Sequence, residues 1–176
     1  MNKITRNILT AILLIIVQTI IFNNINLLGY LNPFVYIIFV AYYPIKNDRL
    51  FFIFISFIIG LLIDVFSDTI GLHAAASVTI AYLRPSVLKI SFGLAYIHQV
   101  IKFENIDFKN KLIYLSLLTV IHHTVLFSLE IFNLSKTLFI FDRVIMSSIF
   151  TATLCILFSY LFKTNERWEN LFYTSQ

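Results

Sequence analysis

Long runs of apolar residues recur along the whole chain, and charged side chains rarely interrupt them. Leu50–Phe66 contains one charged residue, Asp64, and Leu112–Phe132 contains one, Glu130. A helix needs about 20 mostly apolar residues to cross the ~30 Å hydrocarbon core of a bilayer. Runs of this length and purity therefore predict helices that cross a membrane.

The composition supports the same conclusion. Of the 176 residues, 59% are hydrophobic and only 12% are charged, whereas soluble domains carry about 25% charged residues. So little charge excludes a soluble enzyme or a nucleic-acid-binding module. The single cysteine, Cys155, excludes a disulfide framework. We expect an all-α protein, a polytopic transmembrane helical bundle that forms one integral membrane domain over residues 1–176.

Six spans are predicted, each an apolar run bounded by polar residues or proline. They cover residues 8–22, 33–45, 50–66, 70–83, 112–132 and 138–162. The second and fourth are short; Pro33 is expected in the first helical turn of the second, and Arg84-Pro85 is expected to close the fourth. Residues 84–111 alternate apolar and basic side chains, which predicts a cytoplasmic loop lying in the membrane interface.

The distribution of basic residues predicts the orientation of these spans. With both termini in the cytoplasm, only Lys136 and Arg143 of the 13 Lys and Arg residues fall on the outer side. Positive charge collects on the cytoplasmic side of membrane proteins, so this arrangement is favoured. Within the 84–111 loop, Arg84, Lys89 and Lys102 are expected to face anionic lipids.

The chain contains none of the catalytic motifs that we sought. H-E-x-x-H, G-x-S-x-G and P-loop patterns are all absent from the sequence. His122 and His123 are adjacent, so on a helix they point about 100° apart and do not readily share a metal. His123 and Glu130 share a helix face, which favours a helix–helix contact over a proton or metal site. We expect a non-enzyme without cofactor or metal.

The densest polar signal is the stretch 60–85, GLLIDVFSDTIGLHAAASVTIAYLRP. Asp64 is expected to be buried and to need a partner, either Ser67 or the amide groups that start the next helix. Asp68 is a candidate N-cap of that helix, and Gly71 permits a close backbone approach. These features predict a tight hairpin between two spans.

Small residues follow this turn, at Ala74, Ala75, Ala76 and Ser77. Small side chains let helices approach closely in lipid, where burial of apolar surface drives no association. The stretch is therefore either a well-capped hairpin within the chain or an element that positions a partner's membrane helix.

The block GLLIDVFSDTIGLHAAASVTIAYL resembles the signature hairpin of the MreD family of rod shape-determining membrane proteins. The family pattern is G-L-x-x-D-x-x-S-x-x-x-L-G-L-H-A, and this sequence follows it with Ile70 in place of the leucine and with one residue fewer between Ser67 and Ile70. The matching positions are Gly60, Leu61, Asp64, Ser67, Gly71, Leu72, His73 and Ala74. A weaker similarity covers NPFVYIIFVAYYPIKNDR, the family's short second span, where Phe34 stands in place of a common acidic residue.

This resemblance implies a non-catalytic component of the bacterial cell elongation complex, located in the cell inner (cytoplasmic) membrane. MreD-like proteins associate with the bitopic protein MreC. Through it they associate with the elongation transpeptidase, its SEDS-type glycosyltransferase and the MreB filament. The resemblance also implies a helical arrangement similar to the substrate-binding subunits of energy-coupling-factor transporters.

We hypothesise that the hairpin and the short second span form the face that receives the MreC helix. The residues assigned to this partner-binding face are Asp64, Ser67, Gly71, His73, Ala74, Ala75 and Pro33. The alternative function is a solute-binding subunit of an energy-coupling-factor type transporter, which would need a polar pocket near the midplane or the outer leaflet. No role in binding nucleic acid is expected.

Overall fold

A computed structural model of the chain describes residues 3–25, 31–43, 48–93, 106–132 and 134–161. All the α-helices and 3₁₀ turns that follow lie in these ranges, and the described chain forms no β-sheet, so the expected all-α class is confirmed. The elements are α1 (Lys3–Ile20), η1 (Phe22–Asn24), α2 (Ile37–Tyr42), α3 (Arg49–Ser67), α4 (Leu72–Phe92), α6 (Phe108–Ile131), η2 (Leu134–Lys136) and α7 (Thr137–Leu161).

Three of these helices are long and apolar enough to cross a membrane: α3, α6 and α7. Their outer surfaces carry large apolar side chains, such as Phe54 on α3, Leu129 on α6 and Phe141 on α7, that are exposed in the isolated chain. Such surfaces are stable when lipid surrounds them. These helices indicate a membrane protein, while the crossing of a membrane by six spans stays a prediction.

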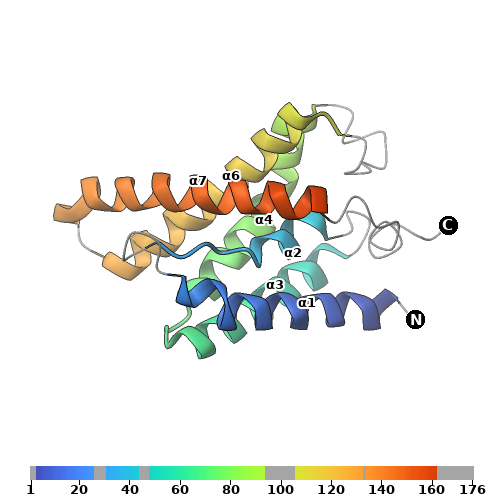
Figure 1. Cartoon of the computed structure of the whole chain (residues 1–176), viewed down its shortest axis with the longest axis horizontal. Coiled ribbons are helices and arrows are strands. Elements are labelled where there is room, and N and C mark those ends of the chain that lie inside the picture. Colours follow the sequence, from blue (N-terminus) through green and yellow to red (C-terminus); the bar gives the residue numbers. More distant parts are fainter. Residues whose placement is uncertain (1–2, 26–30, 44–47, 94–105, 133, 162–176) are drawn as a thin grey trace.

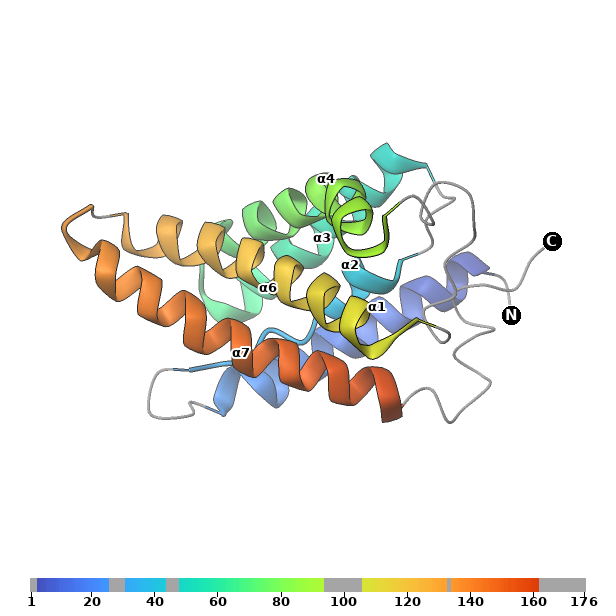
Figure 2. The ribbon, with the colours of Figure 1, turned by 90° about the horizontal axis from the view of Figure 1, so that it is seen from above.

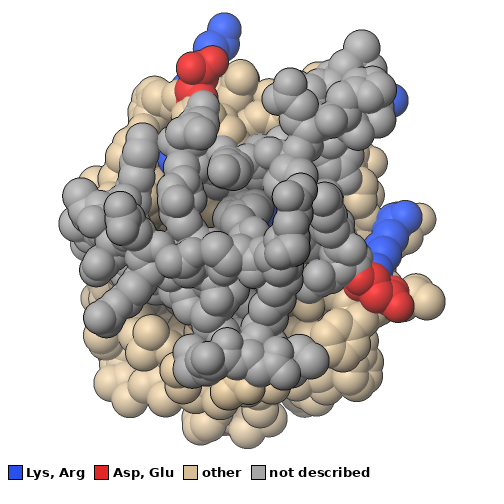
Figure 3. Space-filling view, turned by 90° about the vertical axis from the view of Figure 1, so that its right-hand side faces the viewer, with Lys and Arg blue, Asp and Glu red and all other residues tan. Residues whose placement is uncertain are grey.

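The long helices form one elongated bundle (Figures 1 and 2). Helix α4 packs against both α3 and α6, α7 packs against α6, and α1 lies along α3. The start of α1 and the end of α7 lie at the same end of the bundle, on the right of Figure 1. Seen from that end, the coloured surface is mostly uncharged, with a few acidic and basic side chains at its rim (Figure 3). The hairpin turn between α3 and α4 lies at the opposite end (Figure 1).

The second predicted span differs from the expectation. Within Pro33–Ile45 only the six residues of α2 are helical, Pro33 precedes the helix without entering its first turn, and residues 44–47 lie outside the described part of the chain. Residues 33–41 are all buried. The segment therefore lies in the interior of the bundle, where the surrounding helices enclose it.

The fourth predicted span also differs. Arg84-Pro85 does not close it, because α4 continues through Pro85 to Phe92 and ends at Gly93, whose φ is +60°. Proline in a helix removes one hydrogen bond, but membrane helices tolerate it when neighbours satisfy the backbone. Val87 and Leu88, beyond the proline, are buried in the core and keep this end of the helix in place.

The predicted interfacial loop is therefore shorter than 84–111. Residues 84–92 belong to α4 and residues 108–111 to α6. Lys102 lies outside the described residues, whereas Lys89 is exposed on α4. Arg84 was expected to face lipid, and this expectation is wrong: its side chain is only 3% exposed and points into the bundle.

Candidate functional site

A buried carboxylate joins α3 to α4. The two oxygens of Asp64 accept hydrogen bonds from the backbone N–H groups of His73 and Ala74, each at 2.9 Å, and one oxygen accepts a third from the Thr69 hydroxyl. The first N–H groups of a helix have no partner within the helix, and the helix dipole favours negative charge there. The expected pairing of Asp64 with the amide groups that start the fourth helix is confirmed.

Two residues of the turn have different roles from those predicted. Asp68 does not cap α4; it ends α3 in the left-handed conformation, with φ +55°. Gly71 precedes α4 with φ +74° and has open space where a side chain would lie. Its role is therefore to adopt the left-handed backbone conformation, and it does not bring α3 and α4 close together. The close approach is at Gly60, where an added Cβ would lie 2.6 Å from the Ala74 Cα and the His73 carbonyl oxygen.

We call this contact between α3 and α4, made by Gly60, Asp64, His73 and Ala74, the hairpin clasp. Beside the clasp, the Ser67 hydroxyl accepts a hydrogen bond from the Asn23 side chain at 2.8 Å, which attaches the hairpin to the segment after α1. The residues predicted for partner binding are therefore mostly engaged in contacts within the chain.

The small residues that follow the turn divide into two groups. Ala74, Ala76 and Ser77 are buried against the rest of the bundle, and only Ala75 of the four is partly exposed. Pro33 is buried as well. The second segment and three of the four small residues are thus enclosed, and Ala75 alone of this run reaches the outer surface of α4.

The irregular backbone before α2 is satisfied by side chains from neighbouring helices. Gln18 of α1 donates to the Pro33 carbonyl at 2.9 Å and accepts from the Tyr36 N–H at 3.3 Å. The Thr151 hydroxyl of α7 accepts from the Phe34 N–H at 3.2 Å. Non-helical backbone at membrane depth is tolerated where protein groups satisfy it, and these two side chains do so.

At the other end of α2 a buried arginine performs the same task. Arg84 donates to the carbonyl oxygens of Ala41 and Tyr43, at 3.0 and 2.5 Å, and to the Tyr114 hydroxyl at 3.0 Å. Tyr114 itself donates to the Ala41 carbonyl at 2.8 Å. The guanidinium thus binds the carbonyl groups that a helix leaves unpaired at its C-terminus.

A tyrosine hydroxyl joins α2 to two histidines in the core. The Tyr36 hydroxyl lies 2.6 Å from His122 Nε2 and 3.1 Å from His73 Nδ1. Because a hydroxyl carries one hydrogen, it donates to one ring and accepts an N–H from the other. His123, next along α6, pairs separately with the Thr119 carbonyl and the Thr151 hydroxyl. The cluster joins the region before α2 to α4 and α6.

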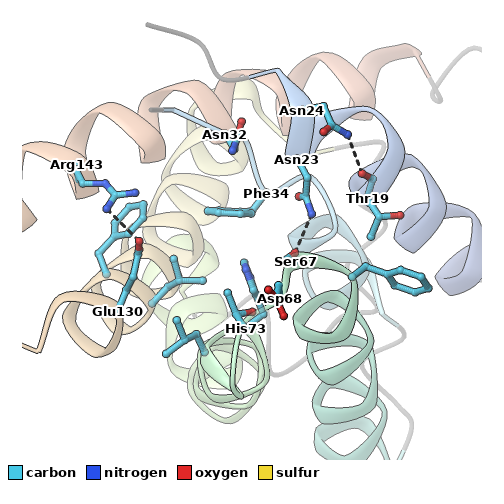
Figure 4. Close-up of a pocket in the computed structure, with 15 residues that line it drawn as sticks. Thr19, Asn23, Asn24, Asn32, Phe34, Ser67, Asp68, His73, Glu130 and Arg143 are labelled. Carbon is cyan, nitrogen blue, oxygen red and sulfur yellow. Dashed lines mark hydrogen bonds and ion pairs between the residues drawn. The ribbon is translucent and has the colours of Figure 1, made fainter. Parts of the chain in front are cut away.

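A pocket of about 420 Å³ opens at the hairpin end of the bundle (Figure 4). Its walls come from the ends of α1, α3 and α6, the starts of α4 and α7, and the segment before α2. Arg143 and Glu130 lie on one side, Asn23 and Ser67 on the other, and Phe34 and His73 between them (Figure 4). The described residues contain no group of three side chains placed to hold a metal ion.

Sequence reasoning did not assign the residues that support the second segment. The sequence predicts no role for Gln18, Tyr36, Tyr114 or Thr151. One feature of the sequence could have indicated these roles. The second apolar run begins with a proline and is too short to cross a membrane, and the non-helical backbone of such a segment needs polar side chains from neighbouring helices.

Comparisons of this chain with protein-family models, with curated proteins and with solved structures give no match. In the part of the chain that the structure describes, the fold and the site define a class: an all-α protein with three helices that could cross a membrane, a clasped α3–α4 hairpin and a polar pocket beside it.

Proposed function

We propose that this chain is a non-catalytic membrane scaffold of the bacterial cell elongation complex, located in the inner membrane. It binds an MreC-like bitopic partner and through it supports peptidoglycan synthesis and cell shape. The observation that carries the proposal is the hairpin clasp. Gly60, Asp64, His73 and Ala74, four positions of the MreD-like motif, are the residues that join the two helices.

The clasp supports a scaffold role because it fixes the direction of α4. A helix held by buried hydrogen bonds at its start presents a defined outer surface to a second helix. On α4 that surface contains Ala75, Thr79 and Tyr82, spaced four and three residues apart, of which Tyr82 is 59% exposed. We place the partner's helix along this stripe, where the small Ala75 side chain permits close approach. The second segment, which is enclosed, has no part in this surface.

Co-purification of the partner tests this placement. Ala75→Leu enlarges the proposed contact without touching the clasp, and we expect about tenfold less MreC-like partner recovered at equal expression. Thr153→Leu, on the exposed surface of α7, is the matched control and should leave recovery unchanged. Undiminished recovery with Ala75→Leu contradicts the proposed surface.

The alternative, a solute-binding subunit of an energy-coupling-factor type transporter, is favoured by the pocket at the hairpin end. In that function the pocket would retain a vitamin-like solute. Mass spectrometry of the denatured, purified protein decides between the two, because tight retention of such a solute supports the transporter subunit. Recovery of an MreC-like partner without a solute supports the scaffold.

A further inference from the structure

The pocket at the hairpin end contains charged groups that the clasp does not use. Arg143 and Glu130 form the ion pair found among the described residues, with the Arg143 Nη1 3.2 Å from the Glu130 Oε1. The guanidinium carbon also lies 4.4 Å from the centre of the Phe127 ring. Aromatic stacking and a carboxylate together fix the plane of the guanidinium.

The donors of Arg143 are only partly used. Its Nε is buried and has no hydrogen-bond partner among the described residues, and a guanidinium has five N–H donors in a planar fork. The ion pair with Glu130 uses Nη1, and the Arg143 side chain lines the pocket and is 18% exposed, so its other terminal N–H donors can bind an anionic oxygen group that enters the pocket.

The pocket also contains negative charge in excess. Asp68, which ends α3, lines the pocket and is exposed. Two carboxylates, Asp68 and Glu130, accompany one guanidinium in the lining. The excess negative charge would repel a ligand that carries only an anionic group, whereas it would attract an ammonium group on the same ligand.

We propose that this pocket binds a phosphoethanolamine group, with the phosphate on Arg143 and the ammonium between Glu130 and Asp68. The volume of about 420 Å³ accommodates such a group together with its glycerol. The group is available from two sources, a zwitterionic lipid at the membrane surface or free glycerophosphoethanolamine. This proposal goes beyond the scaffold function and does not depend on the partner stripe of α4.

Equilibrium binding to the purified full-length chain tests the proposal. The probes are free glycerophosphoethanolamine, with glycerophosphoglycerol as the anionic comparison, and nanodiscs of phosphatidylethanolamine or phosphatidylglycerol read by native mass spectrometry. We expect saturable binding of the ethanolamine probes, about tenfold tighter than their glycerol counterparts. Binding of both ethanolamine probes shows that the headgroup suffices, and binding of the lipid alone identifies the lipid as the source.

Three variants locate the site. Arg143→Gln and Asp68→Asn should each weaken ethanolamine binding about tenfold, while Lys136→Gln, an exposed cation on η2 outside the pocket lining, should change it less than twofold. Asp68 is exposed, and asparagine also accepts the left-handed backbone, so this variant keeps the fold. Three results would overturn the proposal: equal binding of the glycerol probes, unchanged binding in both pocket variants, or no saturable binding. None of these results bears on the recovery of the MreC-like partner.

Discussion

At the scale of single residues, two glycines of the hairpin have different physical reasons to be glycine. Gly60 faces the backbone of α4, where a Cβ would lie 2.6 Å from the Ala74 Cα. Gly71 has no neighbour within 4 Å of an added Cβ, but its φ is +74°. Lack of space excludes a side chain at Gly60, whereas the left-handed backbone conformation disfavours one at Gly71.

This difference predicts how stability responds to side-chain size. Gly60→Ala should destabilise the fold by about 1–3 kcal/mol through overpacking, and Gly60→Leu by clearly more. Gly71→Ala should cost about 1–2 kcal/mol for the left-handed backbone, and Gly71→Leu about the same. Thermal unfolding of the four variants in detergent measures the effect. A size dependence at Gly71 equal to that at Gly60 would contradict the packing described for the clasp.

The sequence was informative about part of this site. An acidic residue inside an apolar run must find a partner, and the unpaired amide groups of the next helix were the nearest candidates, so the pairing of Asp64 could be predicted. The roles of Asp68 and Gly71 could not, because cap positions depend on where each helix ends to within one residue. The burial of Ala74 and Ala76 could not be predicted either, since small residues suit internal and external helix contacts equally.

At the scale of elements, the unusual feature is the short buried helix α2. Its flanking backbone is held at one end by Gln18 and Thr151 and at the other by Arg84 and Tyr114. The hydropathy of this apolar run predicts a short membrane span, because hydropathy does not distinguish a surface in contact with lipid from one in contact with protein. The same limitation applied to Arg84, which was assigned to lipid by its charge although its donors bind α2.

Removing the support at Gln18 should weaken the bundle. Gln18→Met keeps the length of the side chain but leaves the Pro33 carbonyl and the Tyr36 N–H without partners. We expect a loss of about 1–3 kcal/mol in unfolding free energy. Thr19→Val, one residue further along α1, is the control and should cost less than about 1 kcal/mol, because the Thr19 hydroxyl bonds only to carbonyl groups of its own helix. Equal unfolding midpoints for Gln18→Met and the unchanged chain would show that α2 is held by packing alone.

At the scale of the whole molecule, the account depends on how the bundle sits in a membrane. Positive charge at the start of α3 and the end of α4, as at Arg49 and Lys89, predicts that those ends lie on the cytoplasmic side. The same prediction puts the hairpin turn, with its clasp and the pocket, at the outer face. The stripe proposed for the partner on α4 lies between these two ends, and we predict that it faces the lipid.

Site-directed labelling of single cysteines tests this arrangement most directly. In a Cys155→Ala background, Ile70→Cys marks the hairpin turn, where Ile70 is 97% exposed, and Lys89→Cys marks the other end of α4. With a membrane-impermeant maleimide, the account predicts labelling of position 70 only in right-side-out vesicles and of position 89 only in inside-out vesicles. Labelling of both positions from the same side would contradict it.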